Sequence, residues 1–176
     1  NFVCISRPRR FGKSMAGNMI SAYYSKGCDT KEVFSKMKIG EVADFEENIN
    51  KFNVIKLDLN EMYQTSLVEN TDGDAIDYLN KCLRKEFQKE FPDVIFADSS
   101  SIPTCINRVY AERHEKFVVI IDEYDVLIRE KVSSSLFDKY LSFLNLMFKN
   151  ATIRPAIALA YITGIIPIVR DKVQSK

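Results

Sequence analysis

An apolar run that ends in two adjacent acids constrains the fold of this 176-residue chain more than any other feature. The run Phe117–Ile121 is followed directly by Asp122 and Glu123. An uninterrupted apolar run of this length is typical of a strand that is covered on both faces of a parallel sheet. Ligands bind beyond the carboxyl ends of the strands in such sheets. We therefore expect a site at Asp122 and Glu123.

The rest of the chain alternates between strand-like and helix-like segments. Further strands are expected at Phe2–Ile5, Asn53–Leu59 and Ile157–Thr163. Apolar residues at helical spacing predict helices in four stretches: Met15–Tyr24, Asp74–Glu90, Ile106–Glu115 and Ser133–Phe148. Strands that alternate with helices predict an α/β fold, in which a mainly parallel sheet lies between two layers of helices.

The composition narrows the classes of function. Hydrophobic residues make up 46% and charged residues 28%, as in ordinary globular proteins. A net charge of +1 gives no strong field for nucleic acid or membrane, so we expect neither as a partner. The four cysteines lack C-x-x-C spacing and His114 is the single histidine, so we expect free thiols rather than a zinc site. The apolar runs are too short to span a membrane, and we expect a cytoplasmic protein.

Residues 7–14 match most of the phosphate-binding loop (Walker A) G-x-x-x-x-G-K-[ST]. Gly12, Lys13 and Ser14 are present, between an expected strand and an expected helix. Gly12 lets the backbone approach phosphates, Lys13 offers a cation to the β- and γ-phosphates, and Ser14 supplies a hydroxyl for Mg²⁺. Arg7 stands where the first glycine is expected.

The flanking residues extend this expected nucleotide site. The N–H groups at the start of a helix point at a bound anion. The expected nucleotide-binding set is therefore Arg9, Arg10, Phe11, Gly12, Lys13, Ser14 and Met15. For Arg9 and Arg10 the sequence leaves two interpretations open, solvated surface arginines or contacts with phosphate or another subunit. A G-K-S tripeptide also occurs by chance, but the acidic pair downstream favours the functional interpretation.

The acidic pair has the form of a magnesium and base strand (Walker B). One carboxylate at a strand tip holds Mg²⁺, and the next polarises a water for attack on the γ-phosphate. We assign Asp122 to Mg²⁺ and Glu123 to the water. Neighbouring side chains on a strand point to opposite faces, so both serve one site only if the strand ends between them. Asp125 is a third acid in a supporting position or only a loop residue. Thr163, before Gly164, senses the γ-phosphate or orients the water, or it is an ordinary strand-end residue.

Three motifs together resemble the predicted AAA-ATPase-like proteins of bacteria. They are Arg7–Ser14 (RPRRFGKS), Ile121–Asp125 (IDEYD) and Tyr161–Ile165 (YITGI). The resemblance covers nearly the whole chain and makes Arg7 the family's own variant of the loop. It implies ATP and Mg²⁺ as cofactors, with Lys13, Glu123 and Thr163 in catalytic roles and Ser14 and Asp122 at the metal. It also implies that the Ile157–Thr163 strand lies between the two other motif-bearing strands.

Members of this family usually continue into a nuclease-like domain that resembles restriction endonucleases. We expect residues 1–176 to be one nucleotide-binding domain, a truncated core that is incomplete at both ends. Self-association and such a nuclease-like domain are the expected partners besides ATP.

Three functions are compatible with these patterns. The first is Mg²⁺-dependent ATP hydrolysis, as the motor or switch domain of a larger cytoplasmic protein. The second is a P-loop kinase in which Asp58 is the base for a small-molecule hydroxyl. The third is a nucleotide-dependent switch or scaffold without hydrolysis. The pair Asp122 and Glu123 favours water as the acceptor, and so the first function.

Overall fold

The computed structural model of the chain describes residues 2–69 and 74–166. A sheet of four parallel strands runs through this part, in the order β1-β4-β3-β2. The strands are β1 (Phe2–Ser6), β2 (Asn53–Asp58), β3 (Phe117–Asp122) and β4 (Ile157–Gly164). The α/β class and the parallel sheet are confirmed. As the resemblance implied, β4 lies between the strand that leads into the loop and the strand that carries the acids.

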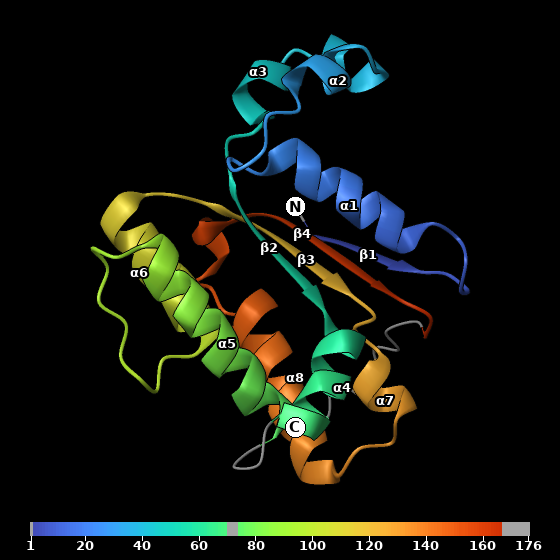
Figure 1. Ribbon diagram of the computed structural model, residues 1–176, viewed down its shortest axis with the longest axis vertical. Helices are drawn as coiled ribbons and strands as arrows, with labels where there is room; N and C mark the ends of the chain where they lie inside the picture. The colour runs from blue at the N-terminus through green and yellow to red at the C-terminus, as the bar shows by residue number, and fades with distance from the viewer. Residues whose placement is uncertain (1, 70–73, 167–176) are drawn as a thin grey trace.

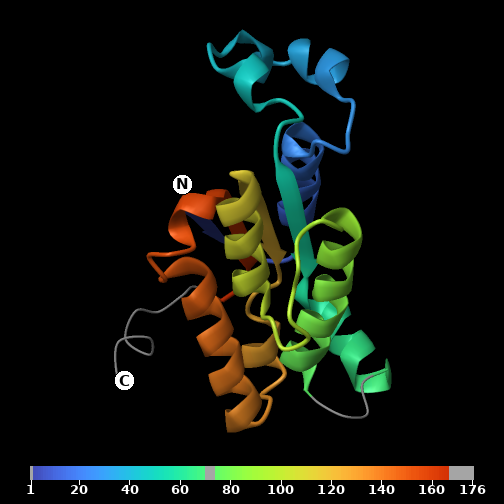
Figure 2. The ribbon, with the colours of Figure 1, turned by 90° about the vertical axis from the view of Figure 1, so that its left-hand side faces the viewer.

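Helices cover both faces of the sheet (Figures 1 and 2). One face packs against α1 (Lys13–Tyr24). The other packs against a larger group of helices: α4 (Leu59–Glu69), α5 (Ala75–Glu90), α6 (Ile102–Arg113), α7 (Val126–Arg129) and α8 (Ser134–Phe148). The 3₁₀ turn η2 (Arg154–Ala156) leads into β4. The result is a three-layer α/β/α arrangement.

A small group of short helices lies at the far end of α1 from the loop (Figure 1). It consists of α2 (Lys31–Ser35), η1 (Lys38–Glu41) and α3 (Phe45–Asn48). Its own buried cluster joins Tyr23 of α1 to Phe34, Phe45 and Ile49. Because the strands point the other way, this group is remote from their carboxyl ends.

The central strand β3 is apolar because every residue in it is buried. Val118 and Ile120 pack towards α1, together with Tyr161 of β4. Phe117, Val119 and Ile121 belong to the larger core on the other face. A strand covered on both faces has no position for a polar residue until it reaches its carboxyl end.

Several element boundaries differ from those expected from the sequence. The strand expected to extend to Leu59 ends at Asp58, and Leu59 begins α4, which was not expected. Helix α6 begins at Ile102 rather than Ile106, because Pro103 fits its first turn, where no N–H donor is needed. The apolar stripe expected on α1 was partly wrong, since Met15 and Met19 are exposed.

Candidate functional site

The loop between β1 and α1 is sharply turned. The N–H of Arg7 donates to the carbonyl of Gly164 over 3.1 Å, which continues the pairing of β1 with β4. Gly12 has φ 73° and immediately precedes α1. Arg10 has φ 67°, which costs a non-glycine residue about 1–2 kcal/mol. The left-handed turn at Gly12 explains why a glycine is needed there.

Lys13 folds back under this loop. Its Nζ donates to the carbonyls of Arg7 and Pro8, each over 2.9 Å. No side chain in the described chain caps the start of α1. Its first N–H groups therefore lack a side-chain partner, the arrangement in which a helix N-terminus accepts an anion.

The two acids meet at one site because β3 ends between them. Asp122 is its last residue, and Glu123 adopts φ 52°, which turns the chain. Asp122 is only 5% exposed. Its Oδ1 accepts hydrogen bonds from the N–H of Glu123, over 3.0 Å, and from the hydroxyl of Thr163. The condition for a shared site is thus met.

The loop and the acids line one cavity of about 440 Å³, a size suited to a small ligand. Six of the seven expected nucleotide-binding residues are among its walls, and Asn60 and Ile165 complete it: Arg9, Arg10, Gly12, Lys13, Ser14, Met15, Asn60, Asp122, Glu123 and Ile165. Phe11 is not among them and is 67% exposed. Thr163 is also not among them; it is buried and reaches the site only through Asp122.

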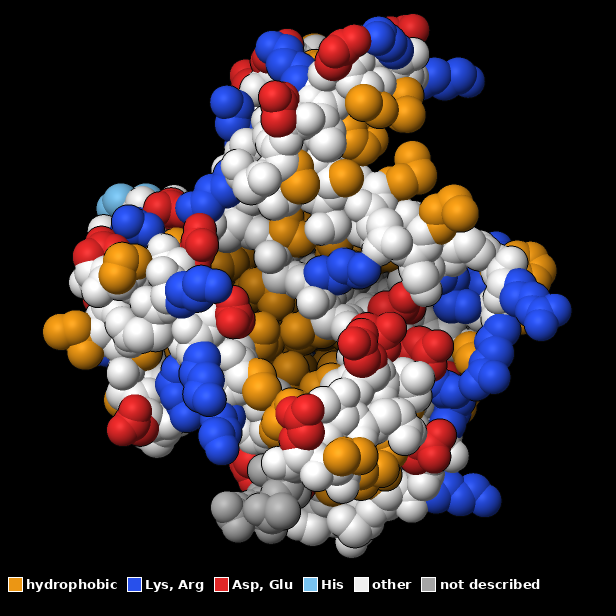
Figure 3. Space-filling view, viewed as in Figure 1, with side chains coloured by type: hydrophobic (Ala, Val, Ile, Leu, Met, Phe, Trp, Pro, Cys, Tyr) orange, Lys and Arg blue, Asp and Glu red, His pale blue; other side chains and the backbone are white. Residues whose placement is uncertain are grey.

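The charges around the cavity are of both signs. Arg9, Arg10 and Lys13 provide three cations, and Asp122 and Glu123 provide two carboxylates. In Figure 3, Lys and Arg side chains gather at the right-hand edge of the face shown, where the β1–α1 loop lies in Figure 1. Cations on the loop and acids on the strand suit a polyanion together with a divalent cation, which the carboxylates prefer.

The family model described as a predicted AAA-ATPase matches residues 1–174. The chain belongs to this family. A comparison with curated proteins and a comparison with solved structures each found no match. No helix in residues 2–69 or 74–166 is long and apolar enough to cross a membrane. Membership of the family indicates nucleotide binding.

A second layer of charged groups lies behind Asp122 and Glu123. Asp125 is fully buried, and its Oδ2 accepts from the N–H groups of Ile165 and Ile166 over 3.1 and 2.9 Å. Arg129 of α7 forms an ion pair with Glu123 and places its Nε 3.5 Å from Asp125 Oδ2. Arg129 was not expected at the site from the sequence, although its spacing of four from Asp125 is typical of an ion pair on a helix.

Two buried tyrosines hold the same turn. The hydroxyl of Tyr140 donates to the carbonyl of Tyr124, whose own hydroxyl donates to the carbonyl of Ile166. Burial raises the pKa of both phenols, and for Tyr140 it does so strongly, with the nearby Asp125 adding to the effect. Both phenols are therefore neutral donors that tie the acidic turn to the end of β4.

Asp58, the base expected for a kinase, has a structural role. It is exposed, and its Oδ1 accepts from the N–H groups of Asn60 and Glu61, each over 3.0 Å. It caps α4 in this way and is not among the residues that line the cavity. His114 is exposed at the end of α6. All four cysteines are free.

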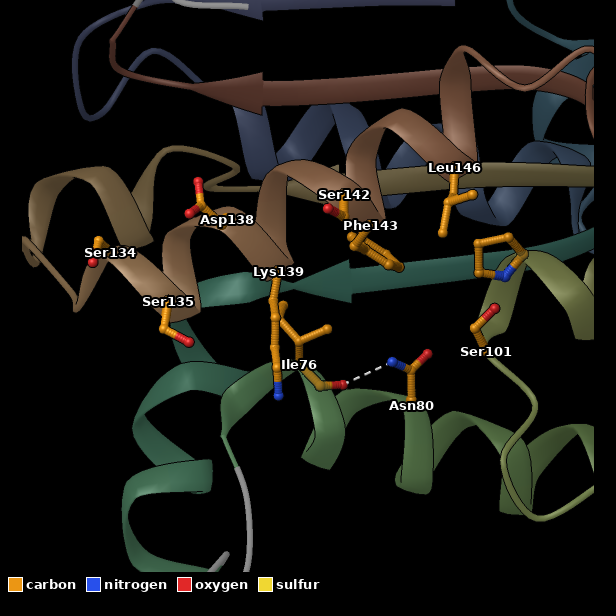
Figure 4. A pocket seen from close by; sticks show the side chains of 11 residues that line it. Ile76, Asn80, Ser101, Ser134, Ser135, Asp138, Lys139, Ser142, Phe143 and Leu146 are labelled. Carbon is orange, nitrogen blue, oxygen red and sulfur yellow. Dashed lines mark hydrogen bonds between the residues drawn. The ribbon is translucent and has the colours of Figure 1, made fainter. Parts of the chain in front are cut away.

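A larger cavity, of about 610 Å³, lies between α5, α8 and the start of α6 (Figure 4). Asn80 is fixed there by a hydrogen bond to the carbonyl of Ile76. Lys139, at its rim, forms ion pairs with Asp74 and Asp77. This cavity shares no lining residue with the one at the loop, and the charge of its lysine is neutralised by these two carboxylates.

Proposed function

We propose that this chain binds ATP with Mg²⁺ in the cavity at the loop and hydrolyses it. In this proposal it is the motor or switch domain of a larger cytoplasmic protein. One observation carries the proposal: Lys13, Ser14, Asp122 and Glu123 line the same cavity, although the loop and the acids are over a hundred residues apart. Self-association and a downstream nuclease-like domain stay predictions.

The loop side of the cavity would hold the phosphates. Lys13 would exchange its two carbonyl contacts for β- and γ-phosphate oxygens, which are stronger acceptors because they are charged. The first N–H groups of α1 would complete the contacts. Arg9 and Arg10 line the cavity and would add positive charge.

The strand side would carry the chemistry. Mg²⁺ is usually held by one or two protein ligands with water and phosphate, so Ser14 and Asp122 suffice, and the ion would neutralise charge on the β- and γ-phosphates. Glu123 would accept a proton from water as the water oxygen bonds to the γ-phosphorus. The bond from that phosphorus to the β–γ bridging oxygen breaks, giving ADP and phosphate. Thr163 would act by orienting Asp122.

Paired substitutions of the acids test this function. Glu123→Gln keeps the shape of the side chain but removes the base, so ATP affinity should stay near that of the wild type while phosphate release falls by about 10²–10⁴-fold. Asp122→Asn should weaken the dependence of ATP binding on Mg²⁺. Calorimetry with and without Mg²⁺, together with a phosphate-release assay, measures both effects.

Asp138→Asn is the matched control, because it removes an exposed carboxylate on α8 that does not line the site. It should leave both measurements unchanged. Normal hydrolysis by Glu123→Gln together with normal Mg²⁺–ATP binding by Asp122→Asn would contradict the proposal.

A further inference from the structure

Arg129 holds the carboxylate of Glu123. The contact joins Arg129 Nη2 to Glu123 Oε2, and the two side chains are 18% and 30% exposed. Glu123 lines the cavity, whereas Arg129 is not among the lining residues. The arginine thus reaches the expected base from outside the ligand space and engages one of its two oxygens.

Arg129 also forms an ion pair with a buried carboxylate. Its Nε lies 3.5 Å from Oδ2 of Asp125, which is 0% exposed. That oxygen also accepts the N–H groups of Ile165 and Ile166. The planar fork of an arginine can contact two carboxylates at once, which the single ammonium of a lysine does less well. Arg129 therefore links a fixed acid to the acid on the cavity wall.

The backbone at Glu123 makes such support useful. Its φ of 52° lies in the left-handed region, which non-glycine residues rarely adopt. Uncommon backbone conformations persist where the surroundings hold them, and they cluster at functional sites. A glutamate side chain has several rotatable bonds, so an unheld carboxylate would sample many positions. The ion pair with Arg129 restricts these positions.

We propose that Arg129 is a positioning residue, which holds Oε2 of Glu123 so that Oε1 faces the attacking water. This inference rests on the proposed ATP hydrolysis and deepens it. Arg129 moves no proton and touches no substrate; it keeps the base within reach of the water, and a displacement of about 1 Å there costs on the order of 10²-fold in rate. An arginine that instead restrained Glu123 in an inactive position would make its removal accelerate hydrolysis.

The test separates positioning from folding and from binding. Arg129→Gln removes the charge, and Arg129→Lys keeps a cation beside buried Asp125 but not the fork. We expect Arg129→Gln to bind Mg²⁺–ATP with wild-type affinity and KM while kcat falls by about 10–100-fold. Arg129→Lys should fold as the wild type does and recover part of kcat. Arg108→Gln, which breaks an exposed pair with Glu112 on α6, is the matched control and should leave kcat unchanged.

A double variant distinguishes a role through Glu123 from a general loss of stability. In a Glu123→Gln background, Arg129→Gln should lower the residual rate less than twofold, because there is no base left to position. Equal kcat, or faster hydrolysis, in Arg129→Gln would overturn the role of Arg129 alone. A full additional loss in the double variant would overturn it as well. If the wild type hydrolyses no ATP, or if its hydrolysis does not depend on Glu123, both this inference and the proposed function would be overturned.

Discussion

The hydroxyl of Thr163, near the end of β4, donates a hydrogen bond to Oδ1 of Asp122, the last residue of β3. The two residues are 41 positions apart in sequence, and they meet because Ile121 pairs with Ile162 in the sheet. They are 1% and 5% exposed, so water does not compete for the contact. Thr163 thus reaches the cavity through the proposed magnesium ligand rather than directly.

Removing this hydroxyl should weaken Mg²⁺ binding more than it weakens the contacts with the nucleotide itself. Thr163→Val keeps the shape of the side chain but leaves Asp122 Oδ1 with only the N–H of Glu123. A hydrogen bond to a charged group contributes about 1.5–3 kcal/mol, so we expect a weaker Mg²⁺ dependence of ATP affinity and a loss of that size in unfolding free energy. Thr163→Ser keeps the hydroxyl and is the control. Identical Mg²⁺ titrations of the Val variant and the wild type would contradict the prediction.

Lys13→Ala should weaken ATP binding by about 1.5–3 kcal/mol, the scale of a charge-assisted contact. Calorimetry measures this directly. Since Lys13 Nζ also ties Arg7 and Pro8 together, thermal unfolding of the variant without nucleotide shows how much of the change comes from the loop itself. Lys85→Ala, on the exposed face of α5, is the control. Equal affinity in Lys13→Ala and wild type would show that the loop does not hold the phosphates.

Gly164→Ala should destabilise the turn that carries the acids. A Cβ at this position would lie 2.5 Å from the Tyr124 ring and 2.9 Å from Asp125 Oδ1, too close for real contacts. Overpacking of this kind costs about 1–3 kcal/mol, which denaturant unfolding measures. Gly27→Ala is the matched control, since its Cβ would find its nearest neighbour at 3.6 Å. If Gly164→Ala is as stable as the wild type, the turn adjusts to the added methyl group without a loss of unfolding free energy, which would contradict the prediction.

The parts of the site that depend on local physics could be predicted from the sequence. A continuous apolar run followed by acids identifies β3 and its carboxyl end, and the tripeptide Gly12–Ser14 identifies the loop that leads from β1 into α1. The order of the strands came from the resemblance rather than from the pattern. Asn60 was missed because the boundary between β2 and α4 is set by the Asp58 cap, not by hydrophobic periodicity.

Contacts that depend on how the elements meet could not be predicted. The ion pair of Arg129 depends on the turn at Glu123, whose φ no sequence pattern reveals. Helix α1 buries Gly17 rather than Met15 against the sheet, since a Cβ on Gly17 would already lie 3.4 Å from Ile120. Periodicity locates an apolar stripe on a helix, but the distance between the helix and the sheet decides which residues lie in the interface.

The capping box at the start of α5 should make stability depend on acid pH. Burial alone would raise the pKa of Asp74, but a hydrogen bond from Lys139 and others from the N–H groups of Asp77 and Ile76 outweigh it and hold that pKa below its ordinary value. A carboxylate with a lowered pKa stabilises the folded state above its unfolded pKa of about 3.9, and this contribution is lost as the pH falls through the folded value.

Asp74→Asn keeps a cap of similar shape but removes the charge. We therefore expect the variant to be less stable than the wild type at pH 7, by no more than about 1 kcal/mol because the pair with Lys139 is partly exposed and screened. The difference should shrink below pH ~4 as Asp74 in the wild type becomes protonated. Urea unfolding at a series of pH values from 7 to 3 measures it, with Asp138→Asn as the exposed control. A difference that stays constant over this range would show that the charge of Asp74 contributes nothing, and that the cap acts only through the shape and acceptor capacity that aspartate and asparagine share.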